Sequence, residues 1–545
     1  MVVRTRFAAR ARAATTVCAL GVVAALAAGC ATVATDSEMS SSPAPSASEA
    51  AEPADPAAAV ALPLPDDGLD IALGRLDGLV ESLMDSTGIP GMSVAVVHSG
   101  RSVYAKGFGV AEVGTGREVG ADTVFPLASV SKPIGATVIA KLVTDDVVEW
   151  STPVAENLPG FALSDLYVTQ NVTIGDMYAH RSGLPEHAGD KLEDMGYDRQ
   201  EVIERLRYVP LDPFRISYNY TNFGLTAAAE SSARKAGEDW ETLSANAIYD
   251  PLGMDRTSSR FRDFEAEPDR VVGHVKVDDE WVPTPAQRNP DAQSPAGGVS
   301  SSVNDLSRWL TMLLAEGEYD GEQIVDSDAL LPALTPEIIS SPSTSTDARA
   351  GFYGYGFNST VTEAGRTQYS HSGAFGLGAA TNLLAIPSAD VAIVALSNAA
   401  PVGAVEVLTA EFADLVQFGE IRQDWRDLYG EFFASEGEPS GSLVGERPPA
   451  DPSAPQPLPS YVGTYRNDVY GPAEVREDGD GLVLALGPDG VTTHELSHWD
   501  ADTFTFTMRN ENAEAGSISA VTFEGDTMTI EYYDDDCSDG VFTRE

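Results

Sequence analysis

Residues 125–132 carry a serine followed three positions later by a lysine, at the start of a predicted helix. Residues three apart on a helix share a face, about 5–6 Å apart at Cβ, so Ser129 and Lys132 can meet. A serine hydroxyl is a weak nucleophile until a base takes its proton, and lysine can be that base when burial or nearby cations lower its pKa. Ser232 and Lys235 repeat the pattern inside a predicted helix that no strand precedes. We interpret this second copy as solvated surface.

Two more short patterns could complete a site for nucleophilic chemistry. The first is Tyr220-Thr221-Asn222. A tyrosine beside an activated serine can relay a proton, and an asparagine amide can orient the substrate or the lysine. The second is the His-Ser-Gly-Ala run at residues 371–374, whose small residues would let a strand edge approach a ligand closely. Each pattern has a structural alternative: a half-buried aromatic near a helix start for Tyr220, and a hairpin turn for the histidine run.

The order of the three patterns along the chain is more specific than any one of them. SxxK, YxN and HxG follow one another at Ser129, Tyr220 and His371. This order resembles the serine β-lactamase and penicillin-binding-protein superfamily, in its branch around class C β-lactamases, DD-peptidases and related esterases. The H-x-S-G-L-P segment within residues 178–185 and the G-G-V-x-S segment within residues 295–301 match that branch as well. The resemblance covers roughly residues 69–418.

The resemblance implies a two-step acyl transfer through an ester on the serine. Ser129 would be the nucleophile, Lys132 its partner base and Tyr220 the group that shares or relays the proton. Asn222 would orient the substrate, and the backbone N–H groups of Ser129 and Ala374 would form the oxyanion hole. The site residues that follow from it are Ser129, Lys132, Tyr220, Asn222, His371, Gly373 and Ala374. No metal ion and no cofactor is implied.

The histidine at position 371 departs from class C β-lactamases, which carry a lysine there. Without that fixed charge a Tyr220 phenolate is less stabilised, so neutral Lys132 is the expected base. A substrate carboxylate also loses a permanent cationic partner, although His371 could donate a hydrogen bond or become a cation at mildly acid pH. We therefore expect an enzyme that hydrolyses D-amino-acid peptides or carboxylic esters, with at most feeble β-lactamase activity. The alternative is a catalytically inactive penicillin-fold binding protein of the cell envelope.

A third possibility is a metallopeptidase, because residues 494–498 fit the zinc pattern HExxH. That chemistry needs both histidines on one face of a helix and a third ligand beyond them. The flanking residues are typical of strands and turns, and no histidine follows His498. We therefore expect no metal. Cys537 is predicted to be an inert thiol, since no neighbouring cation in the sequence would lower its pKa.

The elements that must position these residues indicate an α+β fold. Apolar residues recur every three to four positions over 69–83, a helix, and two strands are predicted to meet in a hairpin at residues 98–101. Further helices are expected around 131–145, 222–236, 303–315 and 403–418, and strands around 379–397. The resemblance implies a class C β-lactamase/DD-peptidase-like domain over residues 67–420, an antiparallel sheet flanked by helices plus a helical region. A helix and Pro-rich linker (421–459) and a small antiparallel β-barrel (460–545) follow.

The first residues indicate export. A basic start, an apolar run and small residues before Cys30 resemble the lipobox of bacterial lipoproteins, so residues 1–29 are predicted to be a signal peptide and Cys30 to be lipidated. An ordinary secretory peptide cleaved near Ala34 is the alternative. Residues 30–66 are rich in Ala, Ser, Pro and Glu and are predicted to be a disordered tether. The expected location is the extracytoplasmic face of the cell membrane, by lipid anchor, or the exterior.

Composition limits the partners. The 545 residues are 43% hydrophobic, enough for a buried core, and carry a net charge of −49, which would repel phosphate backbones. Nucleic acid is therefore excluded, and the expected partner is a small-molecule or peptide substrate of possible cell-wall origin. After removal of the signal peptide only Cys30 and Cys537 remain, so no disulfide framework is expected. The oligomeric state is left open.

Overall fold

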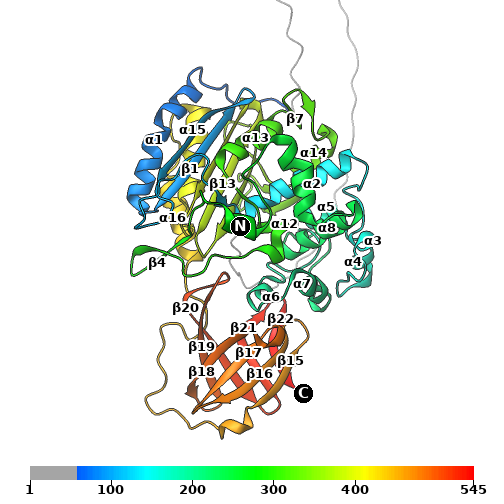
Figure 1. The fold of residues 1–545 in the computed structure, drawn as a ribbon, viewed down its shortest axis with the longest axis vertical. Coiled ribbons are helices and arrows are strands. Elements are labelled where there is room, and N and C mark those ends of the chain that lie inside the picture. Colours follow the sequence, from blue (N-terminus) through cyan, green and yellow to red (C-terminus); the bar gives the residue numbers. More distant parts are fainter. Residues whose placement is uncertain (1–57) are drawn as a thin grey trace, which may run out of the picture. The chain divides into compact units, whose positions relative to one another are not determined.

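An eight-stranded antiparallel sheet forms the centre of the larger region, before the barrel, in the computed structural model, which describes residues 58–545 (Figure 1). The strand order is β2-β1-β14-β13-β12-β11-β10-β9. These strands are β1 (Gly91–His98), β2 (Arg101–Gly109), β9 (Ile338–Ser341), β10 (Gly351–Tyr353), β11 (Asn358–Val361), β12 (Thr367–Phe375), β13 (Ala379–Ile386) and β14 (Val391–Ser397). His98 pairs with Arg101, which confirms the predicted hairpin.

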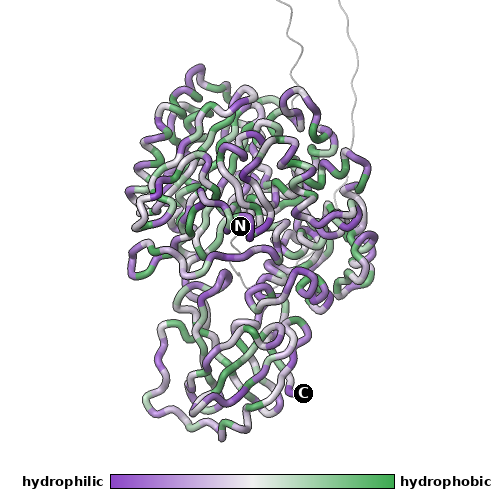
Figure 2. The backbone as a smooth tube through the Cα atoms, in the orientation of Figure 1, coloured by the Kyte–Doolittle hydropathy of each residue, from purple (hydrophilic) through white to green (hydrophobic). Residues whose placement is uncertain are grey.

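The central strands are buried on both faces, which explains their nearly continuous apolar sequences. Along β1, Val94 and Val96 face one hydrophobic cluster while Ala95 and Val97 face the other. The helices α1 (Gly68–Thr87) and α15 (Ala404–Phe418) pack in the first cluster and α13 (Val303–Leu314) in the second. In Figure 2 hydrophobic stretches run through the interior of this region, and many of the outermost loops are hydrophilic.

A helical region covers the face of the sheet that carries α13, and its central helix, α2 (Ser131–Thr144), is almost wholly buried. The predicted helices near 131, 222, 303 and 403 are confirmed as α2, α8, α13 and α15. The remaining helices are α3 (Val154–Asn157), α4 (Leu166–Asn171), α5 (Ile174–Tyr178), α6 (Asp190–Asp194), α7 (Arg199–Arg205), α8 (Asn222–Ala236), α9 (Trp240–Ser244), α10 (Asp250–Leu252), α11 (Phe261–Ala266), α12 (Ser294–Gly297), α14 (Ser327–Leu334) and α16 (Trp425–Glu436). Three two-stranded ribbons complete the region: β3 (Phe125–Pro126) with β6 (Ser300–Ser301), β4 (His274–Val277) with β5 (Glu280–Pro283), and β7 (Glu318–Tyr319) with β8 (Glu322–Gln323).

The C-terminal strands form the predicted barrel. It is closed, because the last strand pairs with the first through Tyr465 and Arg544. The strands are β15 (Gly463–Asn467), β16 (Gly471–Asp478), β17 (Gly481–Leu486), β18 (Thr492–Asp500), β19 (Thr503–Asn510), β20 (Ala513–Glu524), β21 (Thr527–Asp535) and β22 (Ser538–Arg544). Buried and exposed residues alternate along β16 and β20, as expected for a barrel with an apolar interior.

Residues 61–545 form one compact unit, so the barrel and the larger region pack together. The predicted signal peptide (1–29), Cys30 and most of the predicted tether lie outside the described residues. The end of that tether is ordered, because Ala61 and Leu62 donate backbone hydrogen bonds to the Ala364 carbonyl. From residue 58 onward, none of the helices combines the length and the apolarity that crossing a bilayer requires.

Candidate active site

Ser129 lies in a single 3₁₀ turn, Ala128–Val130, immediately before α2. The preceding residue, Ala128, has a φ of 47°, a left-handed conformation that costs an alanine about 1–2 kcal/mol. Ala128 is fully buried against Phe375 and Ala379 of the neighbouring strands, and this packing holds it in place. The strained turn thus fixes Ser129 at the start of the helix, beside the end of β12.

Lys132, the second residue of α2 and one turn after Ser129, is fully buried with its side-chain amine against Ser129. Its Nζ atom lies 3.0 Å from Ser129 Oγ, 2.7 Å from Asn222 Oδ1 and 3.0 Å from the Ala296 carbonyl oxygen. Burial lowers the pKa of Lys132 to about 7, with the charge of Asp190 opposing this shift. A neutral amine has two N–H donors and one lone pair. Asn222 Oδ1 and the Ala296 carbonyl can accept from the two N–H groups, and the Ser129 hydroxyl can donate to the lone pair.

Tyr220 covers the other side of this lysine, with its ring centroid 4.5 Å from Lys132 Nζ. Burial raises the pKa of Tyr220, while a hydrogen bond with Ser129 opposes this, so the phenol is protonated at neutral pH. The ring of His180, from the H-x-S-G-L-P segment, packs against Tyr220 with 4.5 Å between centroids. His180 also accepts the Thr221 N–H at Nδ1 and so fixes the chain next to Tyr220.

Asp190 and His187 extend the site and were missed by the sequence patterns. Asn222 donates through Nδ2 to Asp190 Oδ2 (2.8 Å), which also lies 2.9 Å from His187 Nδ1. Asp190 is buried at the start of α6, whereas the His187 side chain is half exposed. The chain of contacts therefore runs from Ser129 through Lys132 and Asn222 to a buried carboxylate. The only signal in the sequence is a histidine three residues before an aspartate.

His371 is held as a neutral acceptor. Its Nδ1 lies 2.7 Å from the Ser372 carbonyl oxygen, which can only accept, so Nδ1 carries the proton and Nε2 accepts from the Tyr353 hydroxyl at 2.8 Å. Burial, assisted by the nearby Lys132, lowers the pKa of His371 to about 3. Both ring nitrogens of His371 are therefore occupied within the protein, and in this arrangement the ring has no free N–H to offer a substrate.

The strand that carries His371 has a free edge beside Ser129. β11 pairs with β12 only as far as Ser370, so among the strands of residues 58–545 only β13 pairs with residues 371–375. A Cβ atom on Gly373 would lie 2.4 Å from the Leu127 carbonyl oxygen and 2.9 Å from Ser129 N. Only glycine permits this approach. Ala374, the next residue, is exposed at the same edge.

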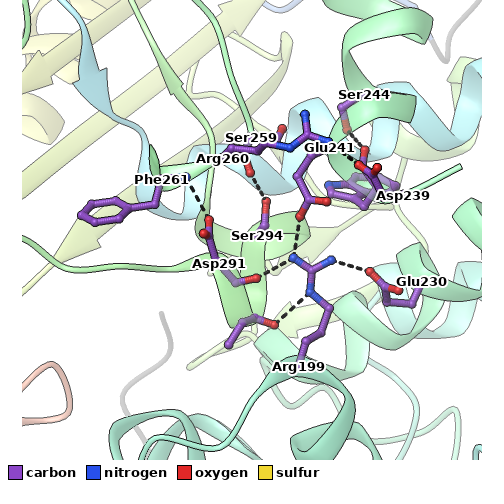
Figure 3. A network of polar contacts seen from close by, with 12 residues as sticks. Arg199, Glu230, Asp239, Glu241, Ser244, Ser259, Arg260, Phe261, Asp291 and Ser294 are labelled. Atoms are coloured by element: carbon purple, nitrogen blue, oxygen red, sulfur yellow. Dashed lines mark hydrogen bonds and ion pairs between the residues drawn. The ribbon is translucent and has the colours of Figure 1, made fainter. Parts of the chain in front are cut away.

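A partly buried polar network holds the acceptor for Lys132 on α12. In Figure 3, Arg199 of α7 contacts Glu230 of α8, Glu241 of α9 and the Asp291 carbonyl oxygen at 2.5–2.6 Å. Ser294, the first residue of α12, donates to the Ser259 carbonyl oxygen at 2.6 Å. These contacts tie the three helices α7, α8 and α9 to the segment 291–296, so the Ala296 carbonyl has a fixed position.

The other sequence patterns lie away from this cluster. His494 and His498 are on strand β18, not on a helix: the first stacks on Phe506 and the second lies 2.9 Å from the Ala501 carbonyl oxygen. Within residues 58–545 no three His, Cys, Asp or Glu side chains are grouped to hold a metal ion. Ser232 is buried and bonded to the Ala228 carbonyl, so our interpretation of this serine as solvated surface is wrong.

The structure thus brings Ser129, Lys132, Tyr220, Asn222, His371 and Gly373 together, with Ala374 at the adjoining edge. This arrangement can deprotonate a serine by a neutral amine, protonate a leaving group from a phenol, and offer backbone amides to an oxyanion.

Comparisons with known proteins agree with this geometry. Residues 76–417 match the family described as Beta-lactamase, and residues 447–536 match a domain of unknown function (DUF3471). An unguisins hydrolase from Aspergillus campestris is 27% identical over 449 residues, 77% of this chain and 80% of that protein.

Two solved structures share the fold, each at 20% identity. The octameric penicillin-binding protein homologue from Pyrococcus abyssi covers 84% of this chain and 98% of its own, with a TM-score of 0.57. A class C β-lactamase from Rhodobacter sphaeroides covers 64% and 99%, with a TM-score of 0.52. The predicted fold and superfamily are confirmed, and the chain belongs to the β-lactamase family of serine hydrolases.

Proposed function

We propose that this protein is an exported serine hydrolase that cleaves amide or ester bonds through an acyl-enzyme on Ser129. The observation that carries the proposal is the environment of Lys132, which has two acceptors and one hydroxyl around a buried amine whose pKa burial lowers to about 7. A structural lysine would gain nothing from losing its charge, whereas a base for Ser129 must be neutral before it reacts.

In the first step Lys132 takes the proton of Ser129 Oγ as the Oγ–carbon bond forms. The substrate oxygen becomes an oxyanion that accepts from the N–H groups of Ser129 and Ala374, donors commonly worth about 3 kcal/mol each. The Tyr220 hydroxyl passes a proton to the leaving nitrogen or oxygen and regains one from Lys132. The carbon–leaving-group bond then breaks. Water attacks the ester in the second step, and Ser129 leaves with its proton restored.

The proposed substrates lack a free carboxylate beside the scissile bond. His371 is neutral and internally bonded. Arg288 is a buried cation near this wall, and its guanidinium lies 2.6 Å from Glu193 and 3.7 Å from Glu511. Because Arg288 already has two carboxylate partners, a substrate carboxylate would find no unpaired cation in Arg288 and a neutral ring at His371. Peptides of D-amino acids with blocked ends and neutral carboxylic esters fit this wall; penicillins, which carry a carboxylate, would react feebly.

The proposed location is the extracytoplasmic face of the membrane, through lipid on Cys30. The support is the sequence of residues 1–30, with its basic start, apolar run and small residues before the cysteine. Incorporation of labelled palmitate that requires Cys30 would support the anchor, and incorporation into a Cys30→Ala variant would exclude it.

The test of the reaction is intact mass and turnover with three acyl donors: an activated neutral ester, the same ester with a carboxylate beside the scissile bond, and a penicillin. We expect the neutral ester to be hydrolysed at least tenfold faster in kcat/KM than its carboxylate counterpart, with a transient acyl mass on the wild type. The Ser129→Ala variant should lose at least 1,000-fold of the activity and form no adduct. Equal turnover of penicillin and neutral ester would contradict the substrate class, and full activity of Ser129→Ala would contradict the mechanism. Absence of turnover and adduct in the wild type would favour the inactive binding protein.

A further inference from the structure

The tip of one barrel hairpin reaches the end of the oxyanion strand. This tip, residues 510–513, joins β19 to β20. The carboxylate of Glu511 accepts the backbone N–H of Gly376 at 3.0 Å and of Leu377 at 3.3 Å. These two residues follow directly on Phe375, the last residue of β12, so a barrel side chain holds the turn that leaves the edge carrying Ala374.

Glu511 also faces a buried cation on the catalytic side. The guanidinium of Arg288 lies 3.7 Å from Glu511, 2.6 Å from Glu193 of α6, and 4.9 Å above the ring of Phe375. Both carboxylates and the guanidinium have side chains at most 11% exposed. Arg288 therefore joins three elements, the barrel tip, α6 and the end of β12, in one charge cluster that water hardly enters.

The next residue of the tip, Asn512, contacts α6 on the other side of the hairpin. Asn512 donates through Nδ2 to Asp194 Oδ2 at 2.7 Å, at the end of α6. α6 begins with Asp190, the carboxylate that accepts from Asn222. Glu511 thus contacts the turn after β12, and the neighbouring Asn512 contacts α6.

Other contacts fix the barrel in this position. Lys191 of α6 donates to Asp535 at 2.7 Å, the Tyr197 hydroxyl donates to the Tyr470 carbonyl at 3.1 Å, and Arg205 donates to the Val469 carbonyl at 3.1 Å. These contacts lie on two segments of the barrel, the β15–β16 connection and the end of β21. The tip is therefore held by a docked domain rather than by its own two residues alone.

We infer that the barrel hairpin forms a third wall of the active site, in which Glu511 is a positioning residue that fixes the oxyanion end of β12. Glu511 acts through the Gly376 and Leu377 amides and touches no reacting atom. A free Gly376–Leu377 turn would let the Ala374 amide move, and a displaced oxyanion donor loses most of its effect. The inference rests on the proposed function for its effect on rate, but the contacts themselves can be tested without catalysis.

The experiment compares Glu511→Gln with Glu524→Gln in the full-length protein. Both variants remove one carboxylate from the β19–β20 hairpin, and Glu524 is exposed at its far end. Hydrogen exchange by mass spectrometry follows the peptide that contains Gly376 and Leu377, and steady-state kinetics use the neutral activated ester. Asn512→Ala is a second variant, which alters the hairpin tip but leaves the Glu511 carboxylate beside Arg288 in place.

For Glu511→Gln we expect at least tenfold faster exchange in residues 373–378 and at least a tenfold fall in kcat, with KM changed less than threefold. Asn512→Ala should speed exchange in residues 190–194 instead. Glu524→Gln should match the wild type in every readout. Unchanged exchange and unchanged kcat in Glu511→Gln would overturn the inference, as would a fall in kcat without faster exchange. If Glu511→Gln speeds exchange but the wild-type protein hydrolyses no ester, the contact made by Glu511 is established and only the proposed function is refuted.

Discussion

At the scale of single residues, the proposed mechanism makes the reactivity of Ser129 depend on the protonation of one buried amine, Lys132. Lys132 has two acceptors, Asn222 Oδ1 and the Ala296 carbonyl, for its N–H groups, and the Ser129 hydroxyl faces its remaining position. The ammonium form has no lone pair, so it cannot take the serine proton. Burial favours the neutral form, while the charge of Asp190 favours the ammonium form.

This balance predicts a pH profile. Because burial lowers the pKa of Lys132 to about 7, kcat/KM should fall about tenfold for each pH unit below pH 6 and reach a plateau above pH 8. Asp190→Asn removes the charge that raises this pKa, so its acid limb should move to lower pH and the variant should keep several-fold more of its maximal kcat/KM at pH 6. The control is Asp145→Asn at the far end of α2, which should leave the profile in place. An acid limb that does not move in Asp190→Asn would contradict the assignment of Lys132 as the base.

The patterns in the sequence predicted the residues that touch the serine and not those behind them. Ser129, Lys132, Tyr220 and Asn222 were predicted because short motifs fix their spacing, and the structure brings them together. Asp190 and Tyr353 belong to no motif, and their contacts with Asn222 and His371 exist only once the chain has folded. For the same reason the charge of His371 could not be read from its residue type.

At the scale of elements, the site depends on how closely β12 approaches the turn before α2. The helix and strand predictions came from periodicity and agree with α1, α2, α8, α13, α15 and the central strands. The sequence does not show where β11 stops pairing, because pairing depends on a partner distant in the chain. That endpoint, at Ser370, is what frees the edge beside Ser129.

The close approach predicts that Gly373→Ala will damage the site. The added Cβ would lie 2.4 Å from both the Leu127 carbonyl oxygen and Thr381 Oγ1, so the strand must move away from Ser129. We expect kcat/KM to fall at least 100-fold, comparable to the loss of an oxyanion donor. Gly78→Ala, in the exposed part of α1 with no atom within 4 Å of the new Cβ, should keep full activity and stability. Activity of Gly373→Ala within threefold of wild type would show that the approach is not needed.

At the scale of the whole molecule, a buried carboxylate under the sheet couples stability to pH. Glu406 of α15 is 4% exposed, and one of its oxygens accepts from the Ser372 hydroxyl. Burial raises the pKa of Glu406 from 4.5 to about 7, against the opposing hydrogen bond from Ser372. A carboxyl group whose pKa is raised in the folded state does not lower the free energy of unfolding below pH 4.5. Its destabilising effect grows as the pH rises to about 7 and is complete above that.

Glu406→Gln should therefore stabilise the protein at pH 8 and change little at pH 5. The expected gain at pH 8 is about 2–3 kcal/mol in the free energy of unfolding, a rise of several degrees in Tm. Scanning calorimetry at both pH values measures it, with the exposed Glu420→Gln as the matched control. A larger gain at pH 5 than at pH 8 would contradict the sign of the coupling.

The pairing that closes the barrel affects the stage of biogenesis at which the enzyme gains activity. β22 pairs with β15, so the barrel can close only after residues 538–544 have left the ribosome and, if the chain is exported, the translocation channel. Ser129 and Lys132 lie in the first third of the chain, but the hairpin that contacts the residues after β12 belongs to its C-terminal barrel. A nascent or C-terminally clipped chain would carry the reactive pair without its third wall. Full hydrolytic activity would thus be delayed until the barrel has closed and its hairpin has reached the end of β12.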